Sequence, residues 1–410
     1  MKTIEVEWTP SEGGFDPDRL AKLGTHLRGY VDDGRLPGTN VLVSRGGKVV
    51  YRDVYGYRDI ERSLPVESDT IYRFYSMTKP VTSIALMQLY ENGLLQLKDP
   101  ISKWIPAFAD TEVFVGGDAA KPETREPLRE ISVHDLLTHT SGLTYHFHMA
   151  NSVDEMYRRA GFEWTKSPGD LENQCNVVAS LPLLFDPGTE WNYSYSTDVV
   201  GRIVELVAGV GLDQYFQDHI FEPLGMIDTD FSVRDSERER FASCYYPGTK
   251  SQKATLLDDA QKSRYLREPT ALSGGGGLVS TLGDYHQFTQ ALRNGGELGG
   301  RRIIGRKTLE FMTTNHLPGG ADLTECGRPL FSETAYDGVG FGLGFSVVID
   351  PAKAKVLSQK GEYAWGGAAS TAFWVDPVED VTVIFLTQLL PSSTHPIRAE
   401  MKSLVYQALV

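Results

Sequence analysis

The residues best suited to chemistry are Ser76 and Lys79, in the segment Ser76-Met77-Thr78-Lys79. A serine hydroxyl is a weak nucleophile at neutral pH and needs a base beside it. On a helix, a lysine three residues after a serine lies on the same face, so one short segment supplies both groups. This pair predicts acyl transfer, in which the hydroxyl attacks a carbonyl and holds the acyl group covalently. The plain alternative is a pair of solvated surface residues, which is common at this spacing.

The flanking residues predict a helix that starts close to Ser76. Pro80 is tolerated only in a first helical turn, and Asn92-Gly93 is a typical helix end. Apolar residues recur between them at helical spacing, at Val81, Ile84, Ala85 and Leu89. A lysine within such an apolar setting is desolvated, which lowers its proton affinity and makes it a better base.

A second group of polar residues follows the turn Pro187-Gly188-Thr189. Tyr193 and Tyr195 precede a predicted helix that begins near Asp198. A tyrosine beside a lysine can pass protons, because a nearby cation stabilises phenolate. Alternatively, both tyrosines are buried aromatic residues with satisfied hydroxyl groups.

A third segment, Trp365-Gly366-Gly367-Ala368, precedes a predicted strand. Two glycines at the start of a strand allow the backbone to approach a ligand closely. The N–H groups of Ser76 and Ala368 would then form an oxyanion hole. A glycine bulge in an edge strand is the equally good alternative.

Composition excludes several kinds of partner. The chain has 410 residues and a formal net charge of −14, which argues against nucleic acids and anionic membranes. Its three cysteines show no metal or disulfide spacing, and the histidines lack zinc-helix spacing, so we expect neither metal nor cofactor. The N-terminus has no signal-peptide pattern, which predicts a cytoplasmic protein. The expected partner is a small-molecule substrate, and the sequence leaves open whether the chain forms a homo-oligomer.

Predicted strands occur at both ends of the chain, with helices between them. Residues 1–98 and 295–410 are expected to form one domain with an antiparallel sheet, and residues 99–294 a mostly helical domain. The active site would lie between the two domains.

The three segments, in this order, resemble those of serine hydrolases related to class C β-lactamases and penicillin-binding DD-peptidases. The esterase branch, the family VIII carboxylesterases, is the most similar. This resemblance implies an α+β fold of the β-lactamase/DD-peptidase type, in which helices flank an antiparallel sheet beside a mostly helical domain. It also implies that Ser76 is the nucleophile, Lys79 its base partner and Tyr193 the tyrosine of the Tyr-x-Asn motif. Which of Lys79 and Tyr193 is the base stays open.

Two departures from the lactamase pattern bear on the substrate. Tyr195 replaces the asparagine of Tyr-x-Asn, and Trp365 replaces the lysine of Lys-Thr-Gly, which helps to bind the lactam carboxylate. An aromatic, uncharged wall favours an ester over an anionic antibiotic. Besides these two residues and Gly366 and Gly367, the substrate-binding candidates are Tyr145, Phe147, Trp164 and Phe341.

The sequence therefore predicts a serine carboxylesterase that hydrolyses small, mostly neutral esters through an acyl-enzyme on Ser76. The alternatives are a β-lactamase or DD-peptidase, an acyltransferase of the same fold, and a non-catalytic scaffold.

Overall fold

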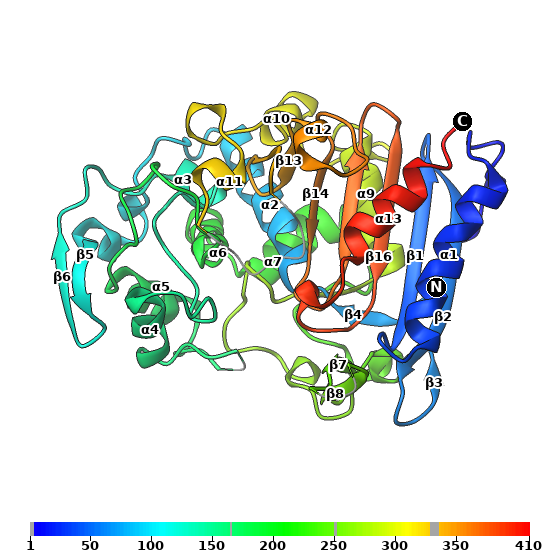
Figure 1. Cartoon of the computed structure of the whole chain (residues 1–410). Helices are drawn as coiled ribbons and strands as arrows, with labels where there is room; N and C mark the ends of the chain where they lie inside the picture. Colours follow the sequence, from blue (N-terminus) through cyan, green and yellow to red (C-terminus); the bar gives the residue numbers. More distant parts are fainter. Residues whose placement is uncertain (1–3, 165, 250–251, 329–335) are drawn as a thin grey trace.

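One side of the protein is an eight-stranded antiparallel sheet (Figure 1). The computed structural model describes residues 4–164, 166–249, 252–328 and 336–410. In spatial order the strands are β12 (Val339–Phe341), β13 (Ser346–Val348), β14 (Tyr363–Gly366), β15 (Ala372–Asp376), β16 (Val381–Leu386), β1 (Gly38–Arg45), β2 (Lys48–Asp59) and β3 (Leu64–Pro65). The two ends of the chain meet where β1 pairs with β16, with Asn40 opposite Leu386. The predicted antiparallel sheet made from both ends of the chain is confirmed.

The central strands form because their residues are buried on both faces. Every residue of β16 is buried, and so are all residues of β1 except Arg45. Runs of Val, Ile, Leu and Phe in these strands suit a pleated surface covered on two sides.

Helices cover both faces of the sheet. On one face lie α1 (Pro17–Asp32) and α13 (Ile397–Tyr406), whose apolar residues join those of β1 and β16 in one core. On the other face α9 (Leu282–Arg293) lies against β15 and β16. Helix α9 falls inside the range 99–294 that we expected to form the helical domain, and the division into domains stays a prediction.

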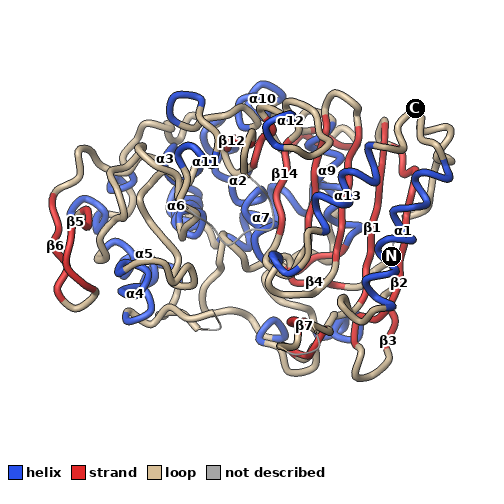
Figure 2. Tube along the Cα trace, in the orientation of Figure 1, coloured by secondary structure: helices blue, strands red, loops and turns tan. Residues whose placement is uncertain are grey.

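The second side of the protein is mainly helices and long loops, as Figure 2 shows. Its helices are α2 (Thr78–Glu91), α3 (Val133–Leu137), α4 (Ser152–Arg159), α5 (Leu171–Ala179), α6 (Ser196–Ala208), α7 (Leu212–Phe216) and α8 (Glu222–Leu224). Shorter helices, α10 (Arg306–Met312), α11 (Leu323–Cys326) and α12 (Pro351–Ala354), lie near β12 to β14. Four strand pairs complete the fold: β4 (Ile71–Arg73) with β9 (Val279–Thr281), β5 (Val113–Asp118) with β6 (Lys121–Arg125), β7 (Cys244–Pro247) with β8 (Ala254–Asp258), and β10 (Glu297–Leu298) with β11 (Arg301–Arg302).

Helix α2 is the central helix of this second side. It packs against α6, and most of its residues are buried, the small polar residues Thr78, Thr82 and Ser83 included. As the sequence predicts, it begins just after Ser76, contains Pro80 in its first turn and ends before Gly93, which is left-handed with φ +72°. Within the described ranges no helix has the length and apolar character needed to cross a membrane.

Candidate active site

The serine lies in a short 3₁₀ turn, Tyr75–Met77, that leads directly into α2. Tyr75 has a left-handed backbone with φ +44°, which is costly for a residue other than glycine and typical of functional sites. Two hydrogen bonds hold this turn: Tyr285 donates to the Met77 carbonyl at 3.0 Å, and Leu278 N–H donates to Thr78 Oγ1 at 3.1 Å.

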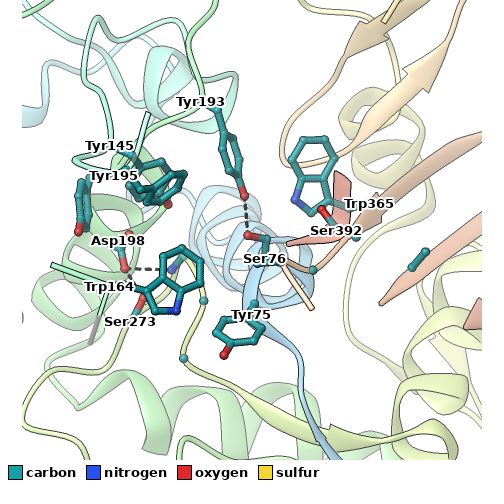
Figure 3. A pocket seen from close by; sticks show the side chains of 18 of the residues that line it. Tyr75, Ser76, Tyr145, Trp164, Tyr193, Tyr195, Asp198, Ser273, Trp365 and Ser392 are labelled. Carbon is teal, nitrogen blue, oxygen red and sulfur yellow. Dashed lines mark hydrogen bonds between the residues drawn. The ribbon is translucent and has the colours of Figure 1, made fainter. Parts of the chain in front are cut away.

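The three predicted reacting groups meet at the serine oxygen (Figure 3). The Tyr193 hydroxyl donates to Ser76 Oγ at 2.6 Å, and Lys79 Nζ lies 3.5 Å from the same oxygen. Figure 3 shows Tyr193 pointing to Ser76 from the helical side, with Trp365 beside it from the sheet. The serine oxygen is therefore in contact with two groups able to move a proton.

Lys79 is buried, and its closest partners are uncharged. Its Nζ donates to the Gly275 carbonyl at 2.6 Å and to the Tyr145 hydroxyl at 3.0 Å. Burial lowers the pKa of Lys79 to about 7, because a desolvated ammonium is costly without a carboxylate in contact. The neutral amine can use its two N–H groups for these acceptors and keep its lone pair for the Ser76 proton.

A carboxylate that the sequence did not single out lies close to this lysine. Asp198, at the start of α6, accepts hydrogen bonds from Ser273 Oγ at 2.5 Å and from Gly275 N–H at 3.1 Å. Its charge partly opposes the fall of the Lys79 pKa, and burial raises the pKa of Asp198 itself. Asp198 thereby fixes the loop whose carbonyl holds Lys79.

This loop contains four consecutive glycines, Gly274 to Gly277, a sequence signal from which a close backbone approach could have been predicted. A Cβ on Gly275 would lie 2.4 Å from the Asp198 carboxylate, and one on Gly274 would lie 2.8 Å from the Thr197 carbonyl. Only glycine permits an approach this close.

Tyr193 stays protonated at neutral pH. Burial raises its pKa, and the hydrogen bond to Ser76 offsets this only in part. Its ring packs against His139, with ring centres 5.0 Å apart, and Lys79 Nζ lies 4.5 Å from its ring centre. His139 is itself buried, and burial lowers its pKa well below the usual value, so it supports the ring as a neutral side chain.

The glycines after Trp365 allow the backbone to pass close to other groups. A Cβ on Gly366 would lie 2.3 Å from the Arg398 guanidinium, and one on Gly367 would lie 2.3 Å from the Phe74 carbonyl. Ala368 lines the same cavity as Ser76, and in the described part of the chain its N–H has no hydrogen-bond acceptor. An oxyanion hole made of Ser76 and Ala368 stays a prediction that this arrangement permits.

A comparison with protein families supplies the classification. A family model described as Beta-lactamase matches residues 23–406 of the chain. The chain belongs to the beta-lactamase family. This confirms the resemblance inferred from the three sequence segments.

Similar proteins agree with this classification. Protein Rv1367c of Mycobacterium tuberculosis (strain ATCC 25618 / H37Rv) is 35% identical over 371 residues, which cover 89% of each chain. Esterase EstB of Burkholderia gladioli is 30% identical over 394 residues, covering 91% of each chain. The solved structure of EstCE1, a hydrolase with promiscuous acyltransferase activity, has a TM-score of 0.80 at 28% identity and covers 95% of this chain and 99% of its own. This member of the beta-lactamase family is a serine hydrolase.

Two of the predicted reacting groups, Ser76 and Tyr193, line a cavity of about 740 Å³. Most of the predicted substrate-binding residues line it: Tyr145, Phe147, Trp164, Tyr195, Trp365, Gly366 and Gly367. Figure 3 shows Tyr145 and Tyr195 on one side of the cavity and Trp365 on the other.

Two of these residues, Tyr195 and Tyr145, make contacts that the sequence did not predict. The Tyr195 hydroxyl faces His146 Nδ1 at 3.1 Å, and its ring centre lies 4.5 Å from that of Tyr145. Tyr145 is buried, and its hydroxyl accepts a hydrogen bond from Lys79 at 3.0 Å, so it contacts a predicted reacting group as well as the cavity.

The prediction that Phe341 binds substrate is wrong. It is 1% exposed and lies in a small apolar cluster with Trp191, Leu317 and Leu323. Its ring packs behind Trp365, with ring centres 5.3 Å apart, and it does not line the cavity in the described part of the structure. Phe341 supports the wall of the cavity, because β12 directs its side chain into the core.

Proposed function

We propose that this protein is a serine carboxylesterase that works through an acyl-enzyme on Ser76. The observation that carries the proposal is the Ser76 hydroxyl between a buried amine, Lys79, with a pKa of about 7 and a protonated phenol, Tyr193. Esterase EstB and EstCE1, both similar along almost the whole chain, support hydrolysis of esters.

In the first step, neutral Lys79 takes the Ser76 proton while the serine oxygen attacks the ester carbonyl. The pKa values favour this assignment, because at neutral pH Lys79 is partly unprotonated, whereas burial keeps Tyr193 in its phenol form. The Ser76 and Ala368 N–H groups would hold the oxyanion of the tetrahedral intermediate.

In the second step the carbon–oxygen bond to the alcohol breaks. Tyr193 donates its proton to the leaving oxygen, and the proton held by Lys79 passes back to the phenolate. A water molecule then attacks the carbonyl of the acyl-enzyme with the same proton transfers, giving a carboxylic acid and free Ser76.

The groups next to the serine favour an ester over an anionic lactam. Trp365 and Tyr195 provide aromatic surface and no cation where the lactamases have lysine and asparagine. We propose substrates that are neutral around the scissile bond. A cavity of about 740 Å³ is large enough for molecules well beyond small esters.

Transfer of the acyl group to an alcohol is the second candidate function. EstCE1 is a hydrolase with promiscuous acyltransferase activity, and an apolar cavity favours an alcohol over water at the acyl-enzyme. The acceptor oxygen attacks the acyl carbonyl, the bond to Ser76 Oγ breaks, and the acceptor's proton passes through Tyr193 and Lys79 to Ser76 Oγ. Adding a competing alcohol to the assay and measuring the new ester by chromatography detects this reaction.

The deciding experiment is Ser76→Ala with a panel of nitrophenyl esters of increasing chain length and a cephalosporin. We expect ester turnover in the parent protein to exceed cephalosporin turnover, and Ser76→Ala to lower it by about 10³-fold or more. A fluorophosphonate probe should label Ser76 in the parent protein alone. Full ester turnover by Ser76→Ala would refute the mechanism, and an unlabelled Ser76 would favour a non-catalytic scaffold.

A further inference from the structure

Three exposed cations are among the residues that line the active-site cavity: Lys166, Arg264 and Arg267. In the described part of the chain none of them has a carboxylate within 4 Å. Arg398 and Lys402 line the cavity as well, as do four carboxylates, Glu163, Asp198, Glu268 and Glu362. The described lining therefore has five cations against four carboxylates, within a protein whose formal net charge is −14.

Arg264 is the cation whose surroundings are best defined. Its Nη1 lies 3.5 Å from the Trp164 carbonyl, and its guanidinium carbon lies 5.2 Å from the centre of the Tyr265 ring. The nearby carboxylate of Asp258 is already occupied, because it binds Arg73 at 2.7 Å and accepts from Ser263 Oγ at 2.8 Å. Asp258 thus pairs with Arg73, and Arg264, which lines the cavity, is held by the Tyr265 side chain and the Trp164 carbonyl with no carboxylate in contact.

Aromatic rings connect this arginine to the nucleophile. Tyr75, next to Ser76 in sequence, has its ring centre 5.9 Å from that of Trp164 and 6.4 Å from that of Tyr265. Figure 3 shows Tyr75 and Trp164 on the same side of the cavity, below Ser76. Arg264 is close enough to Tyr75 and Tyr195 for its charge to lower the pKa of both phenols in part, against the larger effect of burial.

A guanidinium at the end of an aromatic wall is suited to one kind of group. Its planar fork matches a carboxylate with two parallel hydrogen bonds, and as an exposed residue at the cavity Arg264 is accessible to such a group. The rings favour a flat or apolar spacer between that carboxylate and the reacting ester.

We propose that Arg264 binds a carboxylate of the substrate, so that the enzyme prefers esters that are neutral at the scissile bond and anionic at their far end. This inference rests on the proposed esterase function and names the substrate class. The carboxylate belongs either to the acyl part, as in a half-ester of a dicarboxylic acid, or to the alcohol part, as in an ester of a hydroxy acid.

Two matched pairs of esters test the proposal. For the acyl part, mono-4-nitrophenyl glutarate is compared with 4-nitrophenyl valerate. For the alcohol part, 4-carboxyphenyl butyrate is compared with 4-carbamoylphenyl butyrate. We expect kcat/KM of the parent protein to be about tenfold higher for the anionic member of one pair, and that pair identifies the part that carries the carboxylate.

The variant Arg264→Gln should lower this preference about tenfold, mainly through KM, and Arg264→Lys should retain part of it. Arg301→Gln, which removes the same charge from an exposed position on β11, is the matched control and should keep the parent preference. No preference in either pair, or a preference that survives Arg264→Gln, would overturn the proposal.

A binding measurement separates this inference from the esterase function. Glutarate and 4-hydroxybenzoate, the acids released from the two anionic esters, are titrated calorimetrically into the parent protein and Arg264→Gln. One of them should bind the variant about tenfold more weakly. If no ester is hydrolysed but this difference in affinity appears, the esterase function is refuted and the carboxylate site is supported. Equal affinity of both proteins for both acids would refute the carboxylate site.

Discussion

Lys79 and Lys402 are both largely buried, yet they have opposite surroundings. Lys79 on α2 is 2% exposed and contacts a serine, a tyrosine and a backbone carbonyl. Lys402 on α13 is 18% exposed and forms an ion pair with Glu362, which is fully buried. The first lysine has only neutral groups in contact, whereas the second has a carboxylate.

The partners of Lys402 form a hydrogen-bonded network between α13 and the sheet. The Tyr406 hydroxyl contacts Glu362 at 2.5 Å and Asp376 at 2.8 Å. Burial raises the pKa of Glu362, while Lys402 and Tyr406 act in the opposite direction. Every charged or polar group here has a partner, which is typical of a structural network.

The position of the nearest carboxylate therefore decides whether a buried lysine forms an ion pair or can accept a proton. Near Lys79 the carboxylate is that of Asp198, and the hydrogen bonds from Ser273 and Gly275 hold it outside ion-pair distance of the amine. The amine then has a lowered pKa and can accept a proton.

The largest expected effect comes from Lys79→Met. Because the base is lost, kcat for a nitrophenyl ester should fall by about 10³-fold. The folded protein should become more stable by about 1 to 2 kcal/mol at pH 6, since an uncompensated buried ammonium is removed.

The pH dependence gives the sign of this stability effect. The pKa of Lys79 falls from 10.5 to about 7 on folding, so the unfolded chain binds more protons between these values and parent stability rises with pH there. The gain from Lys79→Met should therefore be larger at pH 6 than at pH 10, as thermal unfolding can measure. A loss of stability at pH 6 would contradict the assignment.

Lys402→Met should have the opposite effects, a large loss of stability and a small loss of turnover. It leaves Glu362 buried without its cation, which should lower the free energy of unfolding by about 3 to 5 kcal/mol, as measured in urea. The loss of turnover in the protein that remains folded should be far smaller than for Lys79→Met. The double variant Lys402→Met/Glu362→Gln should recover much of the stability, and no recovery would mean that charge is not the cause.

Asp198→Asn gives the smallest effect and sharpens the comparison. The amide keeps an oxygen for Ser273 and Gly275 but removes the charge that raises the pKa of Lys79. The acid limb of the kcat/KM profile, expected near pH 7, should move down by about one pH unit. Asp284→Asn, at another buried aspartate whose pKa burial raises to about 6, is the control and should leave the limb in place. A limb that stays fixed in Asp198→Asn would mean that Lys79 does not set it.

Local sequence patterns predicted much of the fold and the main candidate residues of the site. Strand sequences at both ends of the chain predicted the sheet, and Pro80 with the apolar residues after it predicted α2. Each of these depends on residues close in sequence, where spacing decides which face a side chain occupies. Ser76 and Lys79 were found for the same reason.

Residues that act through distant neighbours were not found in this way. Asp198 matters because the glycine loop at Gly275, 77 residues later, is folded against it. Phe341 was placed in the pocket by its residue type, although an aromatic side chain in a strand is as readily buried in the core.

The amino-acid sequence by itself determined a serine and a lysine on one helical face, the family and the antiparallel sheet. Only the tertiary structure decided that Tyr193 reaches the serine, that Lys79 has no carboxylate in contact, and that Arg264 faces the cavity without one. The physical reason is that proton affinity and ion pairing depend on burial and on distances of a few ångströms between segments far apart in sequence.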